Sequence, residues 1–363
     1  MPGLTDIRKP ARWVFIARLA GVALGLAYPA LAQNAVAQAL PARTPELVKE
    51  EMFVRIGGIE QWITIKGDDR NNPVLLFLHG GPGDAWSPFA DAMFAGWEKE
   101  FTLVQWDQRG AGRTFGKTGS SIEPTMTVER MAQDGIEVAE FLTKHLNKKK
   151  VIIAGSSWGS ILGIHMAHSR PDLFYAYVGS AQLVNMRKNE SGSYARVLEM
   201  ARKAGDQQAI NALMTIGPPP WDSLRKWPVF AKTLLTYQAK LVTAPPAPEK
   251  ISPAYASPED RAQYEAAEDF SFEHFWGMEM SGPIEHVDLP ALGTDFAIPI
   301  FILQGQEDLK ALPELAKAYF DSIKAPHKQF YLVPGTGHEP SATELNMMLK
   351  VLTEQVRPLA VER

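Results

Sequence analysis

The chain has 363 residues, of which 45% are hydrophobic and 21% are charged, and its formal net charge is −4 at pH 7. This hydrophobic content excludes a disordered polyelectrolyte, and 37 basic against 41 acidic residues exclude the strongly basic surface that nucleic-acid binding requires. The absence of cysteine excludes disulfides, thiol nucleophiles, zinc–thiolate sites and iron–sulfur clusters.

The amino-terminal segment has the pattern of a secretory signal peptide. Basic residues within 8–12 precede an apolar run at 19–28, and the small residues of Ala30–Ala32 form the pattern that a signal peptidase reads. We therefore expect residues 1–32 to be a signal peptide cleaved after Ala32, or after Ala37 at a second match. The mature protein is expected to be periplasmic or secreted.

An uncleaved membrane anchor is the alternative interpretation of this segment. Arg18 interrupts the wider apolar stretch, which leaves it shorter than the roughly 20 residues that span a bilayer. We therefore expect no stable membrane insertion once the signal peptide has been removed.

From Glu46 onward, short apolar runs alternate with helical patterns. Residues 61–66 alternate in polarity like a half-buried strand, and residues 127–146 place apolar side chains at helical spacing. Four continuously apolar runs are typical of strands covered on both faces: 74–78, 102–106, 151–154 and 298–303. This alternation predicts an α/β fold with a mostly parallel sheet flanked by helices.

The alternation of strands and helices stops between residues 183 and 290. This segment contains two proline-rich stretches, 218–220 and 245–248, together with helical patterns and three tryptophans. It indicates an inserted helical unit, 183–290, between two parts of one core, 46–182 and 291–363.

The candidate nucleophile is Ser157. The apolar run 151–154 leads directly into Gly155-x-Ser157-x-Gly159, and a helical pattern follows at 161–169. A chain that reverses sharply from strand to helix leaves the central serine exposed at a helix amino terminus, where a developing negative charge is favoured. The flanking glycines remove side chains that would collide across the turn.

A serine hydroxyl needs a base, and the base needs a group that orients it. The apolar run 300–303 is followed by Asp308, and the run 330–333 is followed by a glycine-rich loop that ends in His338. Both residues are expected at the same sheet edge as the serine, with Asp308 as the acid and His338 as the base. Glu307 is the alternative acid.

Two backbone N–H groups are the candidate oxyanion donors. The apolar run 74–78 leads into a glycine-rich loop, 79–83, whose backbone can approach a substrate closely. We assign the N–H groups of Gly81 and of Trp158, the residue after the candidate nucleophile. His79 is interpreted as a structural residue of the loop.

Three segments together resemble the proline iminopeptidase group of the α/β-hydrolases: His79–Gly83 (HGGPG), Trp106–Gly112 (WDQRGAG) and Gly155–Ser160 (GSSWGS). The resemblance covers about residues 50–182 and 291–363. It implies an α/β-hydrolase fold with a helical cap inserted between two sheet strands, in agreement with the segment described above.

The resemblance also implies site residues. The catalytic triad of the group corresponds to Ser157, Asp308 and His338, and its oxyanion donors correspond to Gly81 and Trp158. Asp107 and Arg109, in the second of these segments, are interpreted as residues that shape a loop near the site.

Members of the group position the free amino end of a peptide with glutamates of the cap, one of them in a Trp-x-x-Trp-Glu stretch. The nearest counterpart here is the segment 270–274, with Glu273 as the candidate, and Glu279 follows six residues later. The resemblance therefore implies Glu273 and Glu279 as substrate-binding residues.

These observations predict a serine hydrolase that forms an acyl-enzyme, and the resemblance implies an aminopeptidase that releases N-terminal proline or a small residue from peptides. The alternatives are a carboxylesterase or amidase acting on small apolar esters or amides, and a non-catalytic binding protein on the same fold. A small molecule or short peptide is the expected substrate. No cofactor or metal is expected, because His165 and His168 have no acidic ligand nearby.

Overall fold

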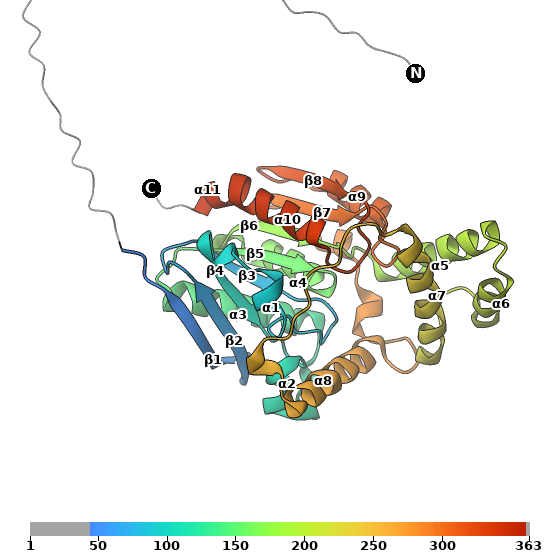
Figure 1. Cartoon of the computed structure of the whole chain (residues 1–363), viewed down its shortest axis with the longest axis horizontal. Coiled ribbons are helices and arrows are strands. Elements are labelled where there is room, and N and C mark those ends of the chain that lie inside the picture. Colours follow the sequence, from blue (N-terminus) through green and yellow to red (C-terminus); the bar gives the residue numbers. More distant parts are fainter. Residues whose placement is uncertain (1–43, 361–363) are drawn as a thin grey trace, which may run out of the picture. The chain divides into compact units, whose positions relative to one another are not determined.

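Eight strands form one sheet in the order β1-β2-β4-β3-β5-β6-β7-β8 (Figure 1). The computed structural model describes residues 44–360. The strands are β1 (Val48–Ile56), β2 (Ile59–Gly67), β3 (Val74–Leu78), β4 (Thr102–Trp106), β5 (Val151–Ser156), β6 (Phe174–Ser180), β7 (Ile300–Gly305) and β8 (Lys328–Val333). Only the β1–β2 and β2–β4 pairs are antiparallel, so the prediction of a mostly parallel sheet is confirmed.

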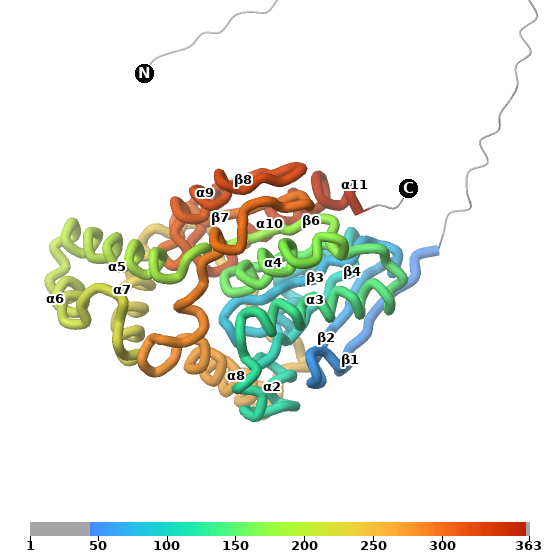
Figure 2. Tube along the Cα trace, turned by 180° about the vertical axis from the view of Figure 1, so that it is seen from behind, coloured from blue at the N-terminus to red at the C-terminus, as the bar shows by residue number. Residues whose placement is uncertain are grey.

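Helices cover both faces of this sheet. They are α1 (Ala90–Met93), α2 (Gly112–Thr118), α3 (Val128–His145), α4 (Trp158–Ser169), α5 (Met186–Lys203), α6 (Gln207–Ile216), α7 (Trp227–Leu241), α8 (Pro258–Trp276), α9 (Pro313–Ser322), α10 (Ala342–Val351) and α11 (Arg357–Ala360). Figure 1 shows α1 and α10 in front of the sheet, and Figure 2, from the opposite side, shows α3 and α4. The chain therefore has the three-layer arrangement expected of an α/β fold.

The central strand β3 shows why the continuous apolar runs are strands. Val74, Leu76 and Leu78 pack into the hydrophobic cluster that contains side chains of α3, α4 and α9. Leu75 and Phe77 point the other way, into the cluster formed with α1, α10 and α11. Because successive side chains of a strand alternate between faces, a strand buried on both faces is apolar at every position.

Four helices, α5 to α8, lie between β6 and β7, in the segment where the sequence indicates an inserted helical unit. Aromatic side chains join α5 and α7, with ring centroids of Trp221 and Phe230 5.0 Å apart and those of Tyr194 and Trp221 6.3 Å apart. Helix α8 packs against α2, where the rings of Phe115 and Phe270 lie 4.9 Å apart. We refer to α5–α8 as the cap.

The predicted signal peptide, residues 1–32, lies outside the described residues and stays a prediction. Among residues 44–360, no helix has the length and apolar character needed to cross a membrane.

Candidate active site

Ser157 occupies a sharp turn between β5 and α4. Its backbone has φ 51° and ψ −116°, a conformation that costs energy for a residue with a side chain. Only glycine fits on either side, because a Cβ at Gly155 would lie 2.4 Å from the carbonyl oxygen of Gly159, and one at Gly159 would lie 1.9 Å from that of Leu78. Close packing of strand, turn and neighbouring strand thus holds the strained serine in place.

Three polar side chains, distant in the sequence, form a continuous hydrogen-bonded chain. Ser157 Oγ lies 2.9 Å from His338 Nε2, and His338 Nδ1 lies 3.0 Å from Asp308 Oδ2. The residues follow β5, β8 and β7 respectively, and the carboxyl ends of these parallel strands share one edge of the sheet. In such an arrangement an imidazole can remove the hydroxyl proton while the carboxylate holds the ring and stabilises its charged form.

The orientation of Asp308 is set by hydrogen bonds from its surroundings. Its Oδ1 accepts from the backbone N–H groups of Lys310 and Ala311, both at 2.8 Å, and its Oδ2 accepts from the side-chain amide of Gln304 at 3.1 Å. The Asp308 side chain is completely buried. The alternative acid, Glu307, is only partly buried, and Asp308 is the carboxylate that contacts the histidine.

The glycine-rich loop after β3 lies against the serine. A Cβ added to Gly80 would be 3.7 Å from the Cβ of Ser157, and Gly81 lines the cavity beside the serine. Trp158 is the first residue of α4, so its N–H has no acceptor in a preceding helical turn. Backbone N–H groups at these positions can stabilise an oxyanion that forms on a carbonyl bound at Ser157.

His79 holds this loop and is uncharged. Burial lowers the pKa of its imidazole to about 4. Its Nδ1 donates to the carbonyl of Gly80 at 2.9 Å, and its Nε2 accepts from the backbone N–H of Gln108 at 3.2 Å. Both ring nitrogens are therefore engaged in fixing the loop.

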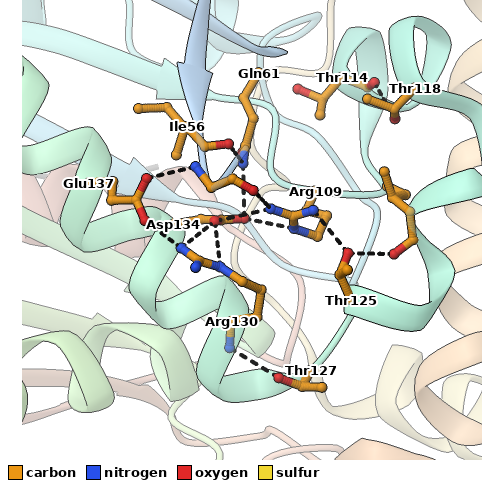
Figure 3. A network of polar contacts seen from close by, with 12 residues as sticks. Ile56, Gln61, Arg109, Thr114, Thr118, Thr125, Thr127, Arg130, Asp134 and Glu137 are labelled. Carbon is orange, nitrogen blue, oxygen red and sulfur yellow. Dashed lines mark hydrogen bonds and ion pairs between the residues drawn. The ribbon is translucent and has the colours of Figure 1, made fainter. Parts of the chain in front are cut away.

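A buried ion-pair network anchors the loop after β4, as Figure 3 shows. The guanidinium of Arg109 bonds to Asp134 on α3 at 2.8 Å and to the carbonyl of Gly57 at 2.9 Å. Arg130 and Gln61 bond to the same Asp134 carboxylate. Arg109 therefore fixes the shape of the loop after β4.

Asp107 is a buried residue of the same loop. Its carboxylate accepts hydrogen bonds from the Ser87 hydroxyl and from the backbone N–H of Arg113. Burial raises the pKa of Asp107 to about 6.

A cavity of about 430 Å³ opens beside Ser157. Apolar side chains of the cap form one wall: Trp227, Phe230, Leu234, Phe272 and Trp276. Ionisable groups also line it, namely the acidic Asp84, Glu190, Glu268, Asp269 and Glu339, together with Lys310 and His338. Because Lys310 already pairs with Glu339 at 2.6 Å, the other ionisable groups of the cavity, apart from His338, are carboxyls, which favour a cationic group.

The structure does not place Glu273 or Glu279 in this cavity. Both side chains are exposed, and neither lines it. Helix α8 turns the face with Phe272 and Trp276 toward the cavity, which directs Glu273 to solvent, and Glu279 lies beyond the end of the helix. The geometry of this cavity therefore gives no support to the expectation that these two glutamates bind the substrate, which stays a prediction.

Glu190 of α5 is a cavity residue that the sequence analysis missed. It is 3% exposed, and its Oε1 has no hydrogen-bond partner. Burial and the nearby Glu285 carboxylate raise the pKa of Glu190 to about 8. Trp276 Nε1 and Glu285 Oε1 are also buried without a hydrogen bond of normal geometry, although the Trp276 indole and the Arg187 guanidinium lie close enough to Glu190 to oppose the rise in its pKa. Buried polar atoms without partners are costly unless a ligand satisfies them.

A sequence signal for Glu190 does exist. Met186, Glu190, Tyr194, Val197 and Ala201 recur at helical spacing and are all buried. An acidic residue within an otherwise mostly apolar helical stripe faces the interior, where a carboxylate needs a partner.

Comparisons with known proteins show what the chain is similar to. Residues 69–345 match the family model described as "Serine aminopeptidase, S33". A relative from Bacillus subtilis (strain 168), "Probable aminopeptidase YbaC", is 30% identical over 310 residues, which cover 83% of this chain and 94% of the relative. A proline iminopeptidase of Lactobacillus delbrueckii subsp. bulgaricus is 24% identical over 298 residues, which cover 81% of this chain and 93% of that protein.

Among solved structures, the proline iminopeptidase of Mycobacterium smegmatis superimposes with a TM-score of 0.61 at 20% identity. The alignment covers 86% of this chain and 99% of that one. At this identity the likeness establishes the fold, which is that of the α/β-hydrolases.

Proposed function

The chain belongs to the S33 serine aminopeptidase family of α/β-hydrolases, and from that premise we propose that it removes the N-terminal residue of peptides by serine catalysis. The observation that carries the proposal is the hydrogen-bonded chain from Ser157 through His338 to Asp308 at the edge of a cavity.

In the proposed mechanism, His338 takes the proton of Ser157 as the serine oxygen attacks the substrate carbonyl. Asp308 orients the imidazole and stabilises its charged form. The N–H groups of Gly81 and Trp158 stabilise the oxyanion, a contribution of about 3 kcal/mol each in comparable enzymes. His338 then protonates the leaving amine, and water activated by the same imidazole releases the acyl group and regenerates the serine.

Glu190 is the proposed acceptor of the substrate's ammonium group. Glu190 lines the same cavity as Ser157, and the charged groups near it are Glu285 and Arg187, whose side chains lie 3.9 Å apart. An ammonium group bound there would supply the missing hydrogen bonds and would favour the ionised carboxylate. The apolar cap wall beside it suits a proline ring or a small side chain, which supports release of N-terminal proline or a small residue.

A substrate panel tests this function. We expect proline and alanine p-nitroanilides to be cleaved with a kcat/KM about 100-fold above that of their N-acetylated forms, because acetylation removes the charge and leaves the cavity carboxylate unpaired. Equal cleavage of free and acetylated substrates would contradict the aminopeptidase assignment. That result, with rapid turnover of p-nitrophenyl butyrate, would support a carboxylesterase or amidase.

The serine mechanism has a separate test. We expect Ser157→Ala to lower kcat by about 10⁶-fold, as in other serine triads. A fluorophosphonate probe should label the wild-type protein and should not label this variant. A folded wild-type protein that remains unlabelled and cleaves none of the substrates would instead be a non-catalytic binding protein.

The role of Glu190 can be separated from general damage to the cap. Glu190→Gln should lower kcat/KM for proline p-nitroanilide by about 100-fold, since it removes one partner of a buried charge pair, and should leave turnover of the uncharged ester almost unchanged. Glu273→Gln, an exposed site of the cap, is the matched control and should behave like the wild type on both substrates. Equal loss on both substrates in Glu190→Gln would contradict the assignment.

A further inference from the structure

Three buried polar side chains of the cap hold the loop that follows Asp308. Gln238 Oε1 on α7 accepts from the backbone N–H of Leu309 at 3.0 Å. Asn189 Oδ1 on α5 accepts from the backbone N–H of Leu312 at 2.9 Å. Asn189 also donates to the carbonyl of Lys310, and Ser193 donates to that of Leu309. The three side chains are between 2% and 5% exposed, so water does not compete for these bonds.

The loop held in this way is the one that orients Asp308. The backbone N–H groups of Lys310 and Ala311 both donate to Asp308 Oδ1 at 2.8 Å. Displacement of residues 309–312 would move these two donors and would allow the carboxylate to rotate away from His338. The position of Asp308 thus depends on side chains of the cap as well as on Gln304 of strand β7, which donates to Asp308 Oδ2 at 3.1 Å and to the carbonyl of Ala311 at 2.8 Å.

The end of α7 also reaches the loop that carries His338. A Cβ added to Gly337 would lie 2.9 Å from Cδ of Gln238, so the carboxamide lies directly against the residue before the histidine. The N–H groups of Thr243 and Ala244 donate to the carbonyl of Gly335 at 2.9 and 3.0 Å. One segment of the cap therefore contacts both the loop that follows Asp308 and the loop that carries His338.

We propose that Gln238, with Asn189 and Ser193, is a positioning residue that keeps Asp308 aligned with His338, so that the cap sets the reactivity of Ser157 in addition to shaping the cavity. This inference rests on the proposed serine mechanism. Asn189 and Ser193 flank Glu190 on α5, and all three line the cavity. Helix α5, which would bind the substrate amine through Glu190, therefore also fixes the loop that follows Asp308.

Two substitutions of equal size separate the hydrogen bond from packing. Gln238→Met keeps the length of the side chain and removes the acceptor, whereas Gln238→Glu keeps an oxygen that can accept from Leu309. Thr233→Ala is the control, because Thr233 is a buried residue of the same helix whose hydroxyl bonds only to the carbonyl of Val229 within that helix. Ser193→Ala is a smaller second change at the same loop.

The measurements are the labelling rate of Ser157 by a fluorophosphonate, and kcat and KM for p-nitrophenyl butyrate, each normalised to folded protein by the amplitude of thermal unfolding. We expect Gln238→Met to lower the labelling rate and kcat by about 10- to 100-fold at nearly constant KM, the size of effect that a small misplacement of a catalytic group produces. Gln238→Glu should recover most of the rate, Ser193→Ala should show a smaller loss, and Thr233→Ala should match the wild type.

A labelling rate of Gln238→Met within twofold of the wild type would overturn the inference while leaving the proposed function intact. Equal losses in Gln238→Met, Gln238→Glu and Thr233→Ala would overturn it as well, because general damage to the cap would then be the cause. Failure of the folded wild-type protein to react at Ser157 would overturn the proposed function, and this inference would fall with it.

Discussion

The indole Nε1 of Trp158 donates a hydrogen bond to the side-chain Oε1 of Gln108 at 2.9 Å. Gln108 also donates twice to His79, from Nε2 to its carbonyl and from the backbone N–H to its imidazole, both at 3.2 Å. All three residues are buried. One glutamine therefore connects the glycine-rich loop, the loop after β4 and the turn of Ser157, which are the three segments that carry the family resemblance.

Removal of this glutamine should affect stability and catalysis together. Gln108→Leu leaves the indole N–H and the carbonyl of His79 buried without partners, at a cost of about 1–3 kcal/mol each. We expect the free energy of unfolding to fall by about 2–4 kcal/mol and kcat to fall with it, as measured by urea unfolding and by turnover. Gln208→Leu on the exposed surface of α6 is the control. Unchanged stability in Gln108→Leu would show that the connection is dispensable.

The network of Figure 3 predicts a difference between buried and exposed ion pairs. Asp134→Asn leaves the buried guanidinium of Arg109 without its carboxylate, which should lower the free energy of unfolding by about 3–5 kcal/mol. The exposed pair of Lys203 and Glu199, 2.6 Å apart, provides the comparison, and Glu199→Gln should cause no measurable change. Urea unfolding of the two variants checks both expectations. Equal stabilities would contradict this assessment of the network.

The sequence predicts the buried strands and the order of the site residues for physical reasons. β3 and β4 coincide with the apolar runs 74–78 and 102–106, because strands covered on both faces are apolar throughout. β1 has no such run, since it lies at the sheet edge and its side chains between the buried Val48 and Ile56 are alternately exposed and half-buried. The sequence does not predict β6 (Phe174–Ser180) either, because small and polar residues, Gly179 and Ser180, interrupt its apolar pattern near the end.

The apolar stripe of α5 indicates that Glu190 is buried, but which cap side chains face the cavity beside Ser157 could not be predicted in the same way. The loops that carry Ser157 and His338 follow parallel strands, and the sheet brings their ends together whatever the cap does. Glu273 and Glu190 lie on cap helices, where the rotation of each helix about its axis decides which side chains face the cavity. That rotation follows from packing of α5, α7 and α8 against the core, which a local sequence pattern does not contain.

The raised pKa of Glu190 predicts the pH dependence of substrate choice. In the free protein this carboxyl is mostly neutral below pH 8, because burial and Glu285 raise its pKa to about 8. The ionised fraction then rises about ninefold from pH 6 to 7 and about fivefold from pH 7 to 8, and the substrate amine loses its proton above about pH 8. We expect the ratio of kcat/KM for proline p-nitroanilide to that for p-nitrophenyl butyrate to rise over this range and to be greatest near pH 8.

Taking the ratio removes any pH dependence that the two substrates share. Glu190→Gln should abolish the rise, because an amide does not ionise. A ratio that stays constant between pH 6 and 8 in the wild-type protein would contradict the pairing of this carboxyl with the substrate amine.

The same shift makes a prediction about stability that needs no substrate. Burial is the main cause that raises the pKa of both Glu190 and Glu344 from 4.5 to about 8 in the folded protein. Folding therefore favours the protonated carboxyls. Their contribution to stability is fully present below about pH 4.5 and is lost as the pH rises through about 8, with a limiting slope of about 1.4 kcal/mol per pH unit for each group.

We therefore expect urea unfolding at pH 5, 6, 7 and 8 to give free energies that decline more steeply with pH in the wild type than in Glu190→Gln. The variant should be about as stable as the wild type near pH 5 and should become the more stable of the two toward pH 8, because its neutral amide imitates the protonated carboxyl at every pH. Glu273→Gln, at an exposed position, should run parallel to the wild type. Parallel curves for the wild type and Glu190→Gln would mean that Glu190 is already ionised in the free protein, with a cation or solvent inside the cavity as its partner.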